Sequence, residues 1–189
     1  MAFVGFDSAW GPADYLRCRD WSAALSDEVA AERPDLVITS MAARQQLIDD
    51  GSGRPMQEQF AEGLRRTWSR WTESGSAVVA IADTPLNGDV RDLDCLLLNP
   101  QSPDACAVPR AAAMPPDPVS LAAKDPLAGL WSADLTSLLC DETDCFAAVG
   151  GEPVFYDADH LSSAYASTLS DALRDVVDDA LESSPGAQP

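Results

Sequence analysis

Two short apolar runs, joined by one amphipathic helical pattern, constrain the fold of this chain more than any other feature. The runs are Asp35–Ser40 and Ala77–Asp83, both rich in β-branched residues. Between them, from about Met56 to Glu73, apolar residues recur at helical spacing, and Gly75 follows as a helix stop. Strand, helix and strand in this order are typical of a βαβ unit with a right-handed crossover. The sequence therefore predicts an α/β fold with a parallel sheet.

Further helices and strands are expected around this unit. A helix is predicted to begin at Asp20 as its N-cap and to end at Arg33-Pro34, because the residue before a proline avoids the helical region. Residues 84–118 carry half of the 14 prolines and are expected to form a long ordered loop. The remaining expected elements are a strand at Ala2–Phe6, a short helix near Pro109–Met114, a helix over Leu121–Leu130, a strand over Leu130–Leu135, a helical turn at Thr136–Leu139, a strand at Pro153–Tyr156 and a helix over Ser162–Leu181.

Size and charge limit the kinds of protein this can be. With 189 residues, we expect a single domain over residues 1–182 and a disordered tail at 183–189. The formal net charge of −19 argues against nucleic acid or an anionic membrane surface as a partner. No apolar run approaches the ~18 residues needed to span a bilayer, and no signal peptide is visible at the N-terminus.

The five cysteines indicate an oxidising compartment. Cys95 and Cys106 flank one loop, Cys140 and Cys145 flank another, and both pairs are predicted to form disulfides, which leaves Cys18 over. Five reduced cysteines in a cytosolic protein are the alternative. The chain has no Cys-x-x-Cys motif, so we expect no metal site and no cofactor.

The segment Tyr156–Ser162 is the strongest candidate for chemistry. It contains His160, the only histidine of the chain, and Asp157 three residues earlier, between a predicted strand end and a predicted helix start. A catalytic histidine needs a carboxylate to hold its ring and to stabilise the imidazolium. Asp157 is the predicted orienting residue and Asp159 is its competitor. A surface or helix-capping role for His160 is the alternative.

The chain resembles the SGNH domain found at the C-terminus of acyltransferase-3 (OafA-like) membrane O-acyltransferases. The Asp-x-x-His motif is the most specific part of the resemblance, and the order and spacing of the other segments support it. Those segments are Tyr15–Trp21, Pro34–Ser40, Asp83-Thr84-Pro85 with Cys95 and Cys106 downstream, and Leu139 through Cys145.

This resemblance implies a three-layer, flavodoxin-like SGNH hydrolase fold. It also implies O-acyl transfer or acyl-ester hydrolysis on a cell-surface glycan, with an acylated glycan or a small ester as substrate. His160 would then take the proton of a serine nucleophile while Asp157 holds the imidazole ring. An extracytoplasmic location and a membrane acyltransferase domain as partner are further expectations.

The nucleophile departs from the family pattern, in which the first strand ends in Gly-Asp-Ser. Phe6-Asp7-Ser8 imitates this block, with Phe6 where the glycine should be. In one interpretation Ser8 is a displaced nucleophile. In the other, which we favour, the chain is N-terminally incomplete, lacking the first strand and helix, and Ser8 lies in a linker before Cys18.

Two other kinds of function remain open from the sequence. One is a catalytically inactive SGNH-like domain that binds carbohydrate or a protein partner, and the other is an unrelated acidic α/β binding module. The loop after Ser40 is the candidate position for an oxyanion hole, but the Gly-x-Asn-Asp motif of simple SGNH esterases is absent there, so no residue is assigned.

Overall fold

A computed structural model describes residues 4–5, 12–44, 46–47 and 49–183. The chain forms two compact units. Unit 1 comprises Met1–Asp83, Pro116–Ala133 and Val176–Pro189, and unit 2 comprises Thr84–Pro115 and Asp134–Asp175. The expected tail at 183–189 lies outside the described residues except for Ser183.

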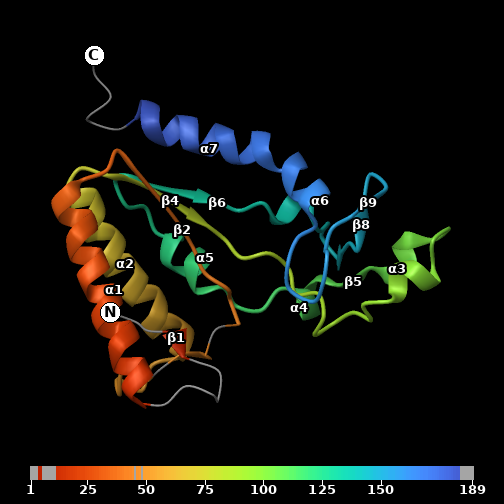
Figure 1. The fold of residues 1–189 in the computed structure, drawn as a ribbon, viewed down its shortest axis with the longest axis horizontal. Coiled ribbons are helices and arrows are strands. Elements are labelled where there is room, and N and C mark those ends of the chain that lie inside the picture. Colours follow the sequence, from red (N-terminus) through yellow and green to blue (C-terminus); the bar gives the residue numbers. More distant parts are fainter. Residues whose placement is uncertain (1–3, 6–11, 45, 48, 184–189) are drawn as a thin grey trace. The chain divides into compact units, whose positions relative to one another are not determined.

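Unit 1 contains the predicted parallel sheet (Figure 1). Its strands are β2 (Leu36–Ser40), β4 (Ala77–Ile81) and β6 (Leu130–Ala133), in the order β2-β4-β6. All pairings are parallel, with Val37 opposite Val78. The central strand β4 is almost completely buried, as expected for the apolar run that predicted it. The α/β fold with a parallel sheet is thus confirmed.

Helices α2 (Met56–Glu73) and α5 (Pro118–Ala123) pack against each other and against this sheet, and α1 (Pro12–Glu32) packs against α2. Trp68 of α2 is fully buried in the core of the unit. The observed bounds of α2 agree with the predicted helix, because its apolar stripe and the glycine after it mark both the buried face and the end.

Two predicted helix boundaries in unit 1 are wrong. Helix α1 begins at Pro12 rather than Asp20, because proline is tolerated in the first turn of a helix, where its missing N–H is not needed. The predicted helix over Leu121–Leu130 is instead α5, which starts at Pro118. Asp117 caps α5 by accepting bonds from the N–H groups of Val119 and Ser120, at 2.9 and 3.2 Å.

The predicted N-terminal strand is seen only as β1 (Val4–Gly5). It pairs antiparallel with β3 (Gln46–Leu47), so the segment predicted as a loop after β2 contains a short strand. The rest of the predicted strand Ala2–Phe6 lies outside the described residues.

Unit 2 consists of short elements joined by ordered loops. Its antiparallel pairs are β5 with β7 and β8 with β9. The elements are α3 (Cys95–Leu98), the 3-10 helix η1 (Pro103–Cys106), β5 (Val108–Pro109), α4 (Arg110–Ala113), the 3-10 helix η2 (Thr136–Leu138), β7 (Asp144–Cys145), β8 (Ala148–Val149), β9 (Glu152–Pro153) and α6 (Ser163–Thr168).

The helix predicted over Ser162–Leu181 is interrupted at Leu169. The structure has α6, which Ser162 caps by accepting a bond from the Tyr165 N–H at 3.1 Å, and then α7 (Ser170–Glu182). Leu169, at the break between the two helices, is buried. The strand predicted at Pro153–Tyr156 is shorter and ends at Pro153.

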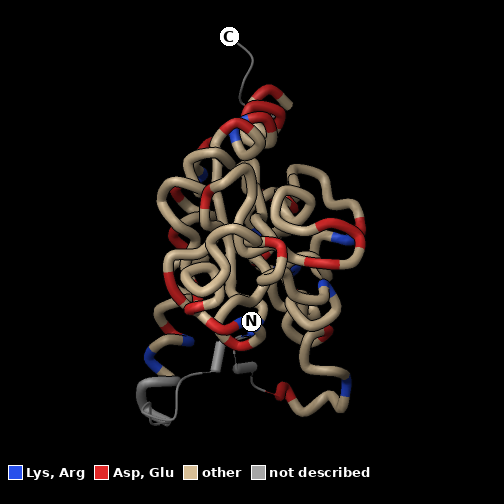
Figure 2. The backbone as a smooth tube through the Cα atoms, turned by 90° about the vertical axis from the view of Figure 1, so that its right-hand side faces the viewer, with Lys and Arg blue, Asp and Glu red and all other residues tan. Residues whose placement is uncertain are grey.

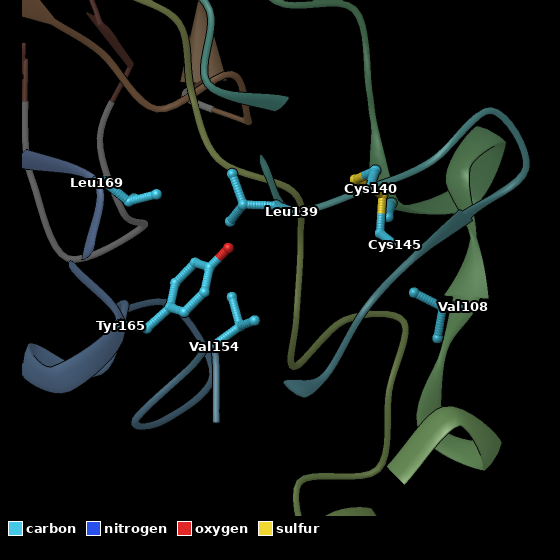
Figure 3. Close-up of a cluster of buried hydrophobic side chains, with 8 residues drawn as sticks. Val108, Leu139, Cys140, Cys145, Val154, Tyr165 and Leu169 are labelled. Carbon is cyan, nitrogen blue, oxygen red and sulfur yellow. A yellow bond between two sulfur atoms is a disulfide. The ribbon is translucent and has the colours of Figure 1, made fainter. Parts of the chain in front are cut away.

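The core of unit 2 includes the Cys140–Cys145 disulfide (Figure 3). Val154, Tyr165 and Leu139 lie in this cluster, and the Tyr165 hydroxyl donates a hydrogen bond to the Leu138 carbonyl oxygen. A core this small can offset only a small loss of conformational entropy when the loops around it fold. The disulfides reduce that loss, because they already restrain the loops in the unfolded chain.

Both predicted disulfides are present. Cys95–Cys106 joins Cα atoms 5.8 Å apart, and Cys140–Cys145 joins Cα atoms 4.0 Å apart. Loops of these lengths correspond to about 2–3 kcal/mol of stabilisation each in the chain-entropy account. Cys18 is a free, half-buried thiol.

Acidic residues are spread over most of the chain (Figure 2). Within the described ranges, no helix combines the length and apolarity required to cross a bilayer.

We predict one reactive thiol per chain when the unreduced protein is denatured and titrated with DTNB, because Cys18 alone is unbridged. A Cys18→Ser variant is the control and should give none. Five thiols in the unreduced wild type would contradict both bridges.

Candidate active site

The side chain of Asp157 organises the turn that contains His160. Its Oδ1 atom accepts hydrogen bonds from the backbone N–H groups of Asp159 and His160, both at 2.8 Å. The same carboxylate contacts Nδ1 of the His160 ring through Oδ2 at 2.9 Å and Oδ1 at 3.0 Å. The structure therefore brings together the two residues predicted from the Asp-x-x-His motif.

The turn is closed at its base by backbone pairing. The Tyr156 N–H donates to the His160 carbonyl oxygen at 2.8 Å, and Phe155 pairs antiparallel with Leu161. One residue further out, the Ser162 N–H donates to the carbonyl oxygen of the fully buried Val154 at 2.9 Å. These bonds attach an exposed turn to the core of unit 2.

The pKa of Asp157 lies below its ordinary value. The largest cause is the hydrogen bond from the His160 backbone N–H, followed by the hydrogen bond from the His160 side chain. Both favour the ionised carboxylate. Asp157 is therefore an anion at neutral pH, as the partner of a catalytic histidine must be.

This contact also assigns the tautomer of His160. Facing an ionised carboxylate, Nδ1 carries the proton, so Nε2 is the ring nitrogen that can accept one. The His160 side chain is 77% exposed, which leaves the Nε2 side of the ring open to an approaching group. Chemically, the pair can act as a general base and then as a general acid.

Sequence reasoning missed a second segment that holds this turn in place. The buried amide of Asn87 donates from Nδ2 to the Asp157 carbonyl oxygen at 2.7 Å, and the Gly88 N–H donates to the Ala158 carbonyl oxygen at 2.9 Å. An Asn-Gly pair in the sequence indicates only a turn. Its partner 70 residues away leaves no local pattern that could reveal the contact.

Gly88 is required by close approach rather than by an unusual backbone angle. A Cβ atom at this position would lie 2.5 Å from the Ala158 Cβ and 3.0 Å from the Ala158 Cα. Any larger side chain must therefore displace the turn that contains Asp157 and His160.

Arg91 links the Asn87 segment to both disulfide loops. Its guanidinium donates to the carbonyl oxygens of Cys106 (2.7 Å) and Cys145 (2.9 Å) and to Oδ1 of Asn87, and it lies over the Phe155 ring at 5.8 Å from the centroid. Burial lowers the pKa of Arg91, but an arginine in a protein stays charged. The guanidinium thus stabilises the Asn87 segment, and that segment holds the turn that contains Asp157.

Two other predicted site positions remain, Ser8 and the loop after Ser40. Ser8 lies outside the described residues. In the loop after Ser40, the Ala43 N–H donates to Oδ2 of Asp83 at 2.7 Å, so this donor is already used and does not serve as an oxyanion-hole group. Within the part of the chain that the structure describes, no group of three or more His, Cys, Asp or Glu side chains is arranged to hold a metal ion.

The parallel sheet with flanking helices, together with a paired His and Asp on a turn before a helix, defines an α/β protein of hydrolase-like type. Residues 3–175 match the family model described as the SGNH domain (fused to AT3 domains), and this chain belongs to that family. Neither the curated proteins nor the solved structures gave a match to this chain. The recognised family and fold are thereby confirmed.

We predict that Gly88→Ala lowers the free energy of unfolding by about 1–3 kcal/mol, because the new methyl group overlaps Ala158. Urea unfolding of the full chain measures this. Ala158→Gly removes the nearest overlapping atom, the Ala158 Cβ. The double variant should therefore lose less unfolding free energy than the sum of the losses in the two single variants. Simple additivity would contradict the close contact.

The carboxyl group of Asp157 should titrate below the ordinary range of aspartate in a ¹³C NMR pH series. Because its folded pKa is lowered, the ionised group stabilises the turn above the unfolded pKa, and this is lost as pH falls through the folded pKa. His160→Ala should keep part of the depression, since the backbone N–H at residue 160 remains. A midpoint at or above the ordinary value in the wild type would refute this account.

Proposed function

We propose that this chain is an O-acyl transfer or acyl-ester hydrolysis domain that acts on a cell-surface glycan. The contact of 2.9 Å between His160 Nδ1 and Asp157 Oδ2 carries the proposal, since it prepares Nε2 to accept a proton. Membership of the SGNH family supports the same reaction class.

In this mechanism His160 takes the proton of a serine hydroxyl as the serine oxygen attacks the ester carbonyl carbon. His160 then gives that proton to the leaving alcohol, which leaves an acyl-enzyme. A second alcohol, or water, attacks the acyl-enzyme with His160 again as base, giving transfer or hydrolysis. Asp157 holds the ring and stabilises the imidazolium in both halves of the cycle.

The mechanism needs a serine oxygen within reach of Nε2 of His160. Ser8 is the serine of this chain that stands in an Asp-Ser context, and it lies outside the described residues. Ser8 and the His–Asp pair can therefore be tested by separate variants.

Location and partner follow from covalent structure and family. Two disulfides are typical of an extracytoplasmic protein, because the cytosol keeps thiols reduced. The family is described as fused to AT3 domains, and we propose that a membrane acyltransferase domain supplies the acyl group to this one. The glycan would then be modified on the outer side of the membrane.

If Ser8 is the nucleophile, the chain should hydrolyse p-nitrophenyl acetate, and His160→Ala should lower kcat/KM by about 10²–10⁴-fold, the usual size of a general-base contribution. Asp157→Asn should lower it less, by at least about tenfold, because a neutral amide stabilises the imidazolium poorly. Release of p-nitrophenolate is the measurement.

Arg174→Ala is a matched control, since this exposed residue pairs with Asp171 on α7 and should leave the rate unchanged. Ser8→Ala separates the two interpretations of the nucleophile: loss of activity assigns that role to Ser8. Wild-type hydrolysis no faster than that of His160→Ala would overturn the enzymatic proposal and favour an inactive domain that binds carbohydrate or a protein partner.

A further inference from the structure

A cavity of about 330 Å³ lies beside the candidate catalytic turn, within unit 2. Asp157 and Tyr156 of the turn form part of its wall. The segment before and within α3 forms another part, and it contributes Asp92, Leu93, Asp94 and Leu97. None of these cavity residues has a role in the proton transfers except Asp157.

We propose that this cavity binds one uncharged sugar ring of the glycan that the His–Asp pair modifies. The inference rests on the proposed function for the role of the bound sugar, but the binding itself is independent of catalysis. Binding of a sugar ring would give a role to cavity residues that take no part in the proton transfers.

The lining has the mixed character that a sugar ring requires. A pyranose presents apolar C–H faces and a rim of hydroxyl groups, so it needs apolar surface beside hydrogen-bond acceptors. Leu93 and Leu97 supply apolar wall, and the carboxylates of Asp92 and Asp94 can accept bonds from hydroxyl groups.

Tyr156 offers a face on which a sugar ring can stack. Tyr156 is 82% exposed, and its backbone N–H donates to the His160 carbonyl oxygen, so the ring projects from an anchored backbone. A single exposed aromatic residue is ordinary, but Leu93 (55%) and Leu97 (79%) are exposed at the same cavity. Exposed apolar side chains gathered at one cavity mark a binding surface.

The apolar wall is held in place before any ligand arrives. Leu93 and Leu97 flank Cys95, which is covalently joined to Cys106, and the Cys106 carbonyl oxygen accepts a bond from Arg91. A wall restrained in this way loses little conformational entropy when a ligand binds.

Charge selects an uncharged sugar over an acidic one. Three carboxylates, those of Asp92, Asp94 and Asp157, line the cavity, so a uronic acid or a phosphorylated sugar would meet like charge. Among the described residues that line the cavity, Arg91 is the one cation, and each of its three guanidinium nitrogens donates to a protein acceptor. It therefore offers little to a ligand anion.

The test is a titration of the isotope-labelled full chain with maltotriose, N,N′,N″-triacetylchitotriose and trigalacturonate, with NMR chemical shifts as the measurement. We expect one of the two neutral trisaccharides to shift the Tyr156 amide and the Leu93 and Leu97 methyl groups at millimolar concentration, and trigalacturonate to leave them unchanged. Tyr156→Ala should weaken this binding about three- to tenfold, the usual worth of one stacked aromatic ring.

Leu97→Ala and Leu98→Ala form a matched pair, because both residues are more than 70% exposed on α3 but only Leu97 lines the cavity. Leu97→Ala should weaken binding and Leu98→Ala should not. Equal effects of the two variants, tighter binding of trigalacturonate, or no shift with either neutral sugar would each overturn the inference. Failure of the proposed function is a different result, the absence of His160-dependent ester hydrolysis, and it would leave a positive binding result standing.

Discussion

The geometry of the candidate site depends on a single carboxylate. The Oδ1 atom of Asp157 closes the turn by accepting two backbone N–H bonds, and both carboxylate oxygens contact the His160 ring. The group that shapes the backbone is thus also the group that orients the imidazole. This arrangement needs no deep burial, which explains how a histidine with most of its surface exposed can still hold one tautomer.

Much of the fold follows from the sequence because the relevant patterns are local. The strands β2 and β4 and the helix α2 between them were predictable, since apolar runs and a 3.6-residue stripe differ clearly. The start of α1 was not, because a proline that usually ends a helix here stands in its first turn. The break at Leu169 was not either, because the apolar spacing continues across it into α7.

The candidate site divides in the same way. Asp157 and His160 are three residues apart, so chain spacing alone predicts their contact. Asn87, Gly88 and Arg91 support that contact from a segment far away in the sequence, and only tertiary structure brings them there. The family indicates the reaction class. The exposed aromatic and aliphatic side chains at the neighbouring cavity indicate the kind of ligand.

Unit 2 is discontinuous along the chain, and this affects the order in which it can form during synthesis. Of the two segments of unit 2, residues 84–115 leave the ribosome first, and the Cys95–Cys106 bridge can form within this segment alone. Arg91 must then wait for the Cys145 carbonyl oxygen, and Asn87 for Asp157, since both belong to the later segment. The turn that contains Asp157 and His160 is therefore expected to be among the last parts of the nascent protein to mature, after most of the chain has been made.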